Sequence, residues 1–294
     1  MDGISLQLLA VQLFTGLALG AIYVLLAVGL SLIFGMLTVV NFAHGAFFMV
    51  GAYAGYLVYQ VIPNFWVCLV AVPVLVSLAG IAAERVLIRP LYGRGIDYPL
   101  LLTFGLAYVM VELVRIGFGK QGLPIDAPEA LQSSVDILIG QFPAYRLFVI
   151  AVTAAVLGGL WLLIEKTSFG LIIRAGARDP QIVRILGIDI ARIWLLVFGL
   201  GTAIAGLAGF LAAPMQGISP EMGGPVLIIA FVVTVVGGMG SLVGAVVAGL
   251  LIGVVESLSV LFFPEAAKAS MFVIMAVVLL IRPQGLFGRA GLMS

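Results

Sequence analysis

Apolar runs of about twenty residues recur along this chain and constrain its fold more than any other feature. A helix needs roughly 20 apolar residues to cross the ~30 Å hydrocarbon core of a membrane, because it rises only about 1.5 Å per residue. We therefore expect an all-α polytopic membrane protein with 8–10 transmembrane helices, nine being the best count. Cutting the sequence at its polar clusters places these segments near residues 8–30, 41–61, 65–83, 99–117, 145–164, 193–213, 224–238, 241–262 and 269–282.

Two places leave the number of segments open. The first apolar run continues through residues 31–40 without a charge, which leaves room for a further short or re-entrant piece. The stretch 224–262 is interrupted only by the Gly-rich residues 237–241, whose composition favours a turn or a broken helix. Irregular backbone at membrane depth must be buried in protein or line a cavity.

The composition supports a membrane protein and argues against other classes. Hydrophobic residues make up 63% of the 294 residues and charged residues only 9%, whereas a soluble domain carries about 25% charged residues. The 37 glycines suit helices that approach closely within a membrane. The net charge of +1 provides no basic face for nucleic acid. The chain is therefore expected to contact lipid and to bind no nucleic acid.

Residues able to support catalysis or metal binding are scarce. Cys68 and His44 are the only cysteine and histidine, which excludes an internal disulfide and multi-ligand Cys or His metal sites. The pair Gly119–Lys120 lacks the rest of a P-loop. No nucleophile–base arrangement is visible, so we expect no catalytic residue, metal or cofactor. The amino terminus carries Asp2 and no cation, which predicts that the sequence does not start with a cleaved signal peptide.

The cations are distributed unevenly between the two predicted sides of the membrane. Ten of the 14 Lys and Arg residues fall on one side: Arg85, Arg89, Arg94, Lys166, Arg174, Arg178, Arg184, Arg192, Arg282 and Arg289. The other side keeps Arg115, Lys120, Arg146 and Lys268. Because cytoplasmic loops carry the excess of cations, we expect the carboxyl terminus in the cytoplasm and, with nine spans, the amino terminus outside.

A short helix is predicted within the cation-rich loop at about 165–192. Asp179 can cap a helix that has Pro180 in its first turn, and Gly187 suits the left-handed residue that ends it. Between them, Ile182, Ile185 and Leu186 share one apolar face. Two interpretations remain open for this cytoplasmic helix: an interfacial anchor for the loop, or a knob that docks in a partner's groove.

A few polar side chains at membrane depth are candidates for a translocation path, because burying them in lipid is costly. Glu112 and Arg115, three residues apart, are expected to pair with each other. The path candidates are Asn41, His44, Thr103, Thr234 and Glu256. Each has a structural alternative: Asn41 as the cap of the second span, His44 as a packing residue, the threonines as interhelical hydrogen-bonding groups, and Glu256 as a partner of a neighbouring helix.

Several motifs resemble one transporter family. Arg174–Ala175, Asp179 and Leu186–Ile188 are similar to the cytoplasmic coupling loop of branched-chain amino acid ABC importer permeases. Further matches lie in order across nearly the whole chain: Gly20–Tyr23, Asn41–Gly45, Arg89–Leu91, Gly237–Ser241, Glu256–Ser257 and Arg282–Leu286. The chain resembles the roughly 300-residue H-type subunit of this family more than its longer partner subunit.

The resemblance implies a single transmembrane permease domain over residues 1–294 of a multi-pass inner-membrane protein. Its partners would be a second permease, usually a paralogue, two cytoplasmic ATPases and a periplasmic substrate-binding protein. Transport would proceed by alternating access with ATP hydrolysed on separate chains. The coupling residues would be Arg174, Arg178, Asp179, Ile182, Ile185, Leu186 and Gly187. Related permeases carry urea or short amides, so those substrates remain open, as does a stand-alone secondary carrier.

Overall fold

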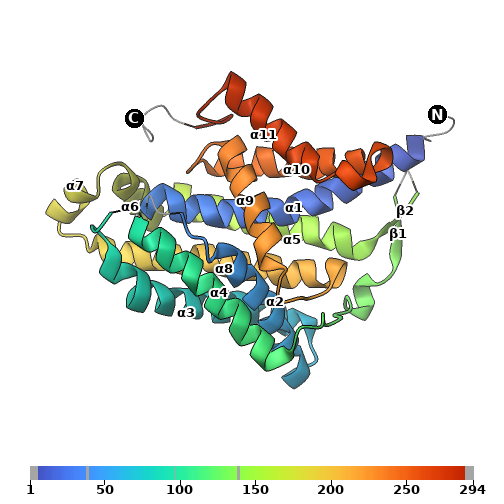
Figure 1. The fold of residues 1–294 in the computed structure, drawn as a ribbon, viewed down its shortest axis with the longest axis horizontal. Coiled ribbons are helices and arrows are strands. Elements are labelled where there is room, and N and C mark those ends of the chain that lie inside the picture. The colour runs from blue at the N-terminus through green and yellow to red at the C-terminus, as the bar shows by residue number, and fades with distance from the viewer. Residues whose placement is uncertain (1–5, 38–39, 96, 138–139, 289–294) are drawn as a thin grey trace. The chain divides into compact units, whose positions relative to one another are not determined.

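The computed structural model is built almost entirely of helices (Figure 1) and describes residues 6–37, 40–95, 97–137 and 140–288. The long and medium helices are α1 (Leu6–Leu37), α2 (His44–Val61), α3 (Phe65–Ala83), α4 (Asp97–Phe118), α5 (Ala144–Lys166), α8 (Ile190–Gln216), α9 (Gly223–Gly237), α10 (Leu242–Phe262) and α11 (Ala269–Ile281). Two short helices, α6 (Ser168–Arg178) and α7 (Pro180–Ile185), lie between α5 and α8.

Each of the nine predicted apolar segments coincides with one of these long or medium helices, so the chain is a polytopic α-helical membrane protein. Six of them, α1, α3, α4, α5, α8 and α10, are long and apolar enough to cross a membrane. Helices α9 and α11 are shorter apolar helices, and α2 has 18 residues. The number that actually crosses therefore stays a prediction.

The structure treats the two ambiguous stretches, residues 31–40 and 237–241, differently. Helix α1 continues without a break to Leu37, so residues 31–37 extend the first helix instead of forming a separate re-entrant piece. Residues 38 and 39, like Asp2 and Arg289, lie outside the described residues. At 237–241 the predicted turn is confirmed: α9 ends at Gly237, Gly238 and Gly240 have positive φ, and the Ser241 hydroxyl caps α10 by accepting from the Gly244 N–H.

The polar stretch 119–143 contains a feature that the helical expectation omits. Strands β1 (Ser134–Ile137) and β2 (Gly140–Pro143) pair antiparallel, with Val135 opposite Phe142. The Phe142 ring is fully buried and lies 5.7 Å, centroid to centroid, from Phe14 of α1. This small hairpin is thus anchored to α1 by aromatic packing.

The chain divides into two compact units that interleave along the sequence. Unit 1 comprises Met1–Ala27, Asp126–Ala154 and Ile229–Ser294, and unit 2 comprises Val28–Ile125 and Ala155–Ile228. Helices α1, α5 and α9 each contribute residues to both units. The expectation of one permease domain over the whole chain stays a prediction.

Within unit 1, small residues let α1 and α10 meet backbone to backbone. A β-carbon added to Gly16 would lie 2.6 Å from the Val254 Cα, and one added to Gly253 would lie 2.4 Å from the Gly20 Cα. Helix α11 packs on α10. The chain after α11 then returns to the end of α9, where the Leu286 N–H donates to the Val236 carbonyl at 2.8 Å.

Unit 2 is built around α8, which packs along α2 and α3 (Figure 1). A β-carbon on Gly51 of α2 would lie 2.1 Å from the Gly206 carbonyl oxygen of α8. A β-carbon on Gly80 of α3 would lie 2.1 Å from the Thr202 Oγ1. These contacts leave no room for larger residues, so glycine sets how closely the three helices approach.

Candidate coupling element and buried polar residues

Helix α6, which the sequence analysis did not separate from its loop, is held firmly against its neighbours. The Thr167 hydroxyl caps it by accepting from the Gly170 N–H at 3.2 Å. A β-carbon on Gly170 would lie 2.0 Å from the Ile164 carbonyl oxygen, so the helix touches the end of α5 directly. Arg174 pairs with Glu165 at 2.8 Å and donates to the Ile164 carbonyl at 2.6 Å. Arg174 therefore helps to hold α6 against the end of α5.

Helix α7 has both of the predicted caps. The Asp179 carboxylate accepts from the Gln181 and Ile182 N–H groups at 2.8 and 3.1 Å, and Pro180 occupies the first turn. At the other end Gly187 has φ +79°, its N–H donates to the Arg184 carbonyl, and the Ile188 N–H donates to the Val183 carbonyl. This pair of bonds is a Schellman motif. Both ends of this helix are therefore defined by local sequence.

The apolar side chains of α7 divide into one that is buried and three that are not. Val183 is 2% exposed and packs into unit 2. The residues predicted to form an apolar face remain uncovered: Ile182 is 56%, Ile185 84% and Leu186 71% exposed. Arg178, the last residue of α6, is also exposed. The element thus presents an apolar surface with a cation beside it.

Four residues outside the predicted set connect α7 to the rest of unit 2. The Arg184 guanidinium lies 5.8 Å from the centre of the Trp194 ring, near the start of α8. The Trp194 ring meets Tyr92 edge-on at 5.1 Å. The Tyr92 hydroxyl donates to Glu84 Oε1 at 2.9 Å. Burial and the Glu84 carboxylate raise the pKa of Tyr92, so its hydroxyl stays protonated and able to donate.

Glu84 marks an irregularity at the end of α3. The residues Glu84–Ile88 form a π-helical turn, and Arg89–Leu91 form a 3₁₀ turn directly after it. The Glu84 side chain is completely buried. Glu84 could have been singled out from the sequence, because a carboxylate at the end of a long apolar run is unusual. Nothing in the sequence indicates that Tyr92 or Trp194 lies near it.

The two ends of unit 2 carry different charge clusters. Contacts through Tyr92, Trp194 and Arg184 bring together the cation-rich stretches 84–98 and 165–192. At the far end of α4, Arg115 forms the predicted ion pair with Glu112 and a second one, at 2.8 Å, with Glu221. Sequence reasoning missed Glu221 because it lies in the turn before α9, far along the chain.

Three path candidates lie in unit 2, around the start of α2. His44 is fully buried, and a β-carbon on Gly29 of α1 would lie 3.2 Å from its Cε1. The buried Thr103 Oγ1 accepts from the Phe42 N–H at 3.1 Å. The expectation that Asn41 caps α2 is wrong in detail, because its Oδ1 accepts from the Ala43 N–H and closes the turn before the helix.

The other two path candidates lie in unit 1 and are also buried. The Thr234 hydroxyl is 3.5 Å from the Ala27 carbonyl of α1. Glu256 of α10 is 6% exposed, and its Oε2 accepts from the Tyr23 hydroxyl at 2.9 Å. Beside it, the Ser257 hydroxyl donates to the Gln12 carbonyl, and the Gln12 amide donates back to the Ser257 carbonyl. Glu256 therefore packs against α1 in this conformation.

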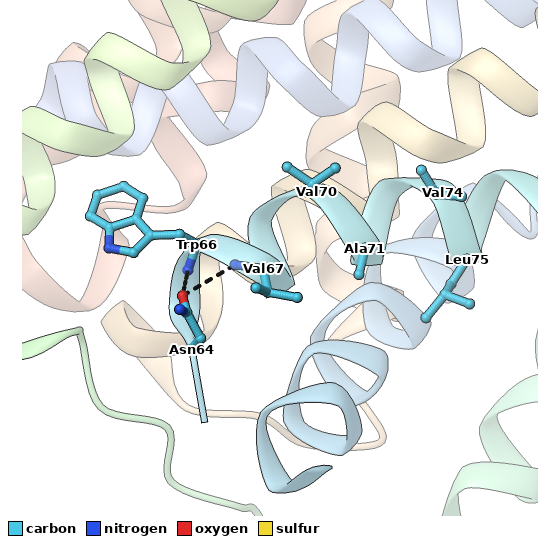
Figure 2. Close-up of a pocket in the computed structure, with 7 residues that line it drawn as sticks. All are labelled: Asn64, Trp66, Val67, Val70, Ala71, Val74 and Leu75. Carbon is cyan, nitrogen blue, oxygen red and sulfur yellow. Dashed lines mark hydrogen bonds between the residues drawn. The ribbon is translucent and has the colours of Figure 1, made fainter. Parts of the chain in front are cut away.

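An apolar hollow of about 580 Å³ lies along one face of α3 (Figure 2). Asn64 at one end of it caps α3, where its Oδ1 accepts from the Trp66 and Val67 N–H groups. The remaining lining is Trp66, Val67, Val70, Ala71, Val74 and Leu75. The lining is therefore mostly apolar, and Asn64 and the indole of Trp66 supply its polar atoms.

Across the described ranges, no three His, Cys, Asp or Glu side chains gather in a way that could hold a metal ion.

Comparison with known proteins finds similarity over nearly the whole chain. A family model described as the permease component of branched-chain amino acid transport systems matches residues 12–282. The high-affinity branched-chain amino acid permease proteins BraD of Pseudomonas aeruginosa and LivH of Escherichia coli are 32% and 28% identical, each over 95% of both chains. The E. coli permease protein LivM is 28% identical over 90% of this chain and 67% of its own length.

A similar fold occurs in the solved structure of PsaBC from Streptococcus pneumoniae in complex with Fab. The TM-score is 0.50, the identity is 12%, and the match covers 91% of this chain and 89% of the other. At that identity the likeness concerns the fold alone.

Proposed function

The chain belongs to the family of permease components of branched-chain amino acid ABC transport systems, and on that premise we propose that it forms part of the pore of an ATP-driven importer. It is a multi-pass transport subunit and not an enzyme. The importer carries branched-chain amino acids into the cytoplasm by alternating access, and the ATP is hydrolysed on separate chains.

The exposed apolar surface of α7 is the observation that carries this proposal. A helix that is capped at both ends, yet leaves Ile182, Ile185 and Leu186 uncovered, is built to be covered by something else. Arg178 beside it suits a partner with an acidic rim. We assign this surface to a cytoplasmic ATPase subunit, with Asp179 and Gly187 shaping α7 and Arg174 holding α6 in place.

The remaining partners and the topology follow from the same premise. The similarity to both LivH and LivM supports a second, paralogous permease beside this one. Two ATPases and a periplasmic substrate-binding protein complete the importer in the cell inner membrane. The meeting of the two Arg-rich stretches in unit 2 supports a common, cytoplasmic side for both. With nine spans, the amino terminus would lie outside and the carboxyl terminus in the cytoplasm.

The translocation path is assigned to the buried polar side chains. Asn41, His44 and Thr103 belong to unit 2, and Thr234 and Glu256 to unit 1. Polar groups at membrane depth are costly and are kept where a path or a partner needs them. Glu256 carries the role that is easiest to test, because a carboxylate can attract the ammonium group of an amino acid as the pore opens.

The decisive experiment purifies the tagged chain from native membranes, identifies the chains that remain bound, and reconstitutes the complex in liposomes. Co-purification of an ATPase and a second permease, with ATP-dependent uptake of L-leucine, supports the proposal. Uptake by the isolated chain without ATP would identify a stand-alone carrier instead. Uptake of urea or acetamide in preference to L-leucine would show that the importer carries urea or short amides instead.

A matched pair of variants tests the path. Glu256→Gln keeps an acceptor for the Tyr23 hydroxyl but removes the charge, so we expect slower L-leucine uptake by an intact complex. Glu265→Gln makes the same change at an exposed residue outside α10 and should leave uptake unchanged. Equal uptake by both variants and the wild type would reduce Glu256 to a packing residue.

A further inference from the structure

Four side chains of unit 2 form a continuous chain of contacts from α7 to α3. Arg184 on α7 lies over the Trp194 ring, which meets Tyr92 edge-on, and Tyr92 in turn donates its hydroxyl to Glu84. The contacts join residues that are a hundred positions apart in the sequence. None of the four belongs to the predicted coupling residues or to the path.

The chain of contacts ends where α3 changes its helical form. A π-helical turn at Glu84–Ile88 is followed at once by a 3₁₀ turn at Arg89–Leu91. Such changes of register often occur at functional sites, because they let part of a helix shift against the rest. Glu84 stands at the first residue of this turn with its side chain completely buried.

The buried Glu84 carboxyl is only partly satisfied. Its Oε1 accepts from Tyr92, whereas Oε2 has no hydrogen-bond partner among the described residues. Burying a carboxyl group costs free energy, and the hydrogen bond from Tyr92 is what offsets part of that cost here. The Tyr92 hydroxyl is therefore the link that fixes the loop after α3 to the end of α3 itself.

The same end of α3 is packed tightly against α8. Gly80 lies one turn before Glu84 and touches Thr202, and a β-carbon on Gly199 would lie 2.7 Å from Ile81. Trp194 lies five residues before Gly199 on α8. Because close-packed interiors transmit displacement instead of absorbing it, a movement of Trp194 must be shared by the ends of both helices.

From this arrangement we propose that Tyr92 and Trp194 are positioning residues, which tie α7 to the ends of α3 and α8 and set how efficiently ATPase movement becomes movement of the pore helices. This inference rests on the proposed docking of an ATPase at α7. Arg184 makes the outer contact of the cluster, and Glu84 anchors the inner one. A partner that displaces α7 pulls on α8 through Trp194 and on α3 through Tyr92.

The test measures ATP hydrolysed per L-leucine imported by the whole complex in liposomes. Tyr92→Phe keeps the ring but loses the hydroxyl, and we expect it to raise this ratio about threefold or more, the scale of one hydrogen bond. Glu84→Ala should raise the ratio by a similar factor. Glu84→Gln keeps an acceptor for the Tyr92 hydroxyl, so its ratio should stay near that of the wild type. Trp194→Leu removes both ring contacts and should give the largest rise.

Matched controls separate coupling from general stability. Tyr98→Phe and Trp161→Leu make the same changes at exposed residues outside the cluster, and the ratio should not change. A ratio equal to wild type in Tyr92→Phe and Glu84→Ala complexes would overturn the inference. If the Tyr92→Phe and Glu84→Ala complexes fail to assemble, the exposed Arg184→Ala decides, because an unchanged ratio there also overturns the inference. Failure of the wild-type chain to retain any ATPase would instead overturn the proposed function.

Discussion

Helices α6 and α7 follow one another in the chain, and both carry arginines and apolar residues, yet they are used in opposite ways. Helix α6 buries Gly170, Ile173 and Gly176 and ties Arg174 to Glu165. Helix α7 buries only Val183 and leaves Ile185 84% exposed. The difference shows that amphipathic composition alone does not distinguish a helix that buries its apolar side chains from one that leaves them exposed.

The largest effect is expected where α6 touches α5. Gly170→Ala adds a β-carbon 2.0 Å from the Ile164 carbonyl oxygen, and backbone cannot yield easily there. We expect a loss of stability on the order of 2 kcal/mol, seen as a lower Tm and less folded protein in detergent. Gly158→Ala in α5 is the control, since a β-carbon there meets nothing within 4 Å. Equal Tm values for both variants would show that α6 is not fixed to α5.

The next effect concerns the surface of α7. Ile185→Asp places a charge on a side chain that contacts little in this chain, so the Tm should stay within about a degree of wild type. ATPase co-purification should fall at least about tenfold, because a carboxylate would be buried in the interface. Ile185→Val should retain the ATPase, and Val183→Asp should instead lower the Tm. ATPase retention by Ile185→Asp would return α7 to the alternative of an interfacial anchor.

Features that depend on neighbouring residues in the sequence could be predicted, whereas features that depend on tertiary contacts could not. The nine helical segments were predictable because apolar length alone specifies them, and α7 was predictable because its caps at Asp179 and Gly187 are local. Helix α6 was missed because Gly170 and Gly176 disfavour a helix until Ile164 and Ile190 pack against them. Glu221, Tyr92 and Trp194 gain their partners only through tertiary contacts, which leave no periodic signal.

A smaller effect is expected from the exposed cation beside α7. Arg178→Glu reverses a charge at the end of α6, and ATPase co-purification should weaken by about threefold to tenfold at low salt. The difference from wild type should shrink near 0.5 M salt, because screening shortens the range of surface charges. Lys120→Glu makes the same change at the opposite end of unit 2 and should have no effect. A salt-independent loss would mean that Arg178 acts through packing.

The smallest effect tests whether α7 must be formed before it is bound. Asp179→Ala removes the side chain that accepts from the Gln181 and Ile182 N–H groups, which costs about 1 kcal/mol of local helix stability. Hydrogen exchange of the α7 amides should accelerate about fivefold while exchange in α6 stays unchanged, and ATPase binding should weaken by no more than that factor. Asp179→Ser retains a capping oxygen and should restore both. Accelerated exchange in α6 as well would show that the two helices form one cooperative element, and the contrast between a fixed helix and a presented one would no longer hold.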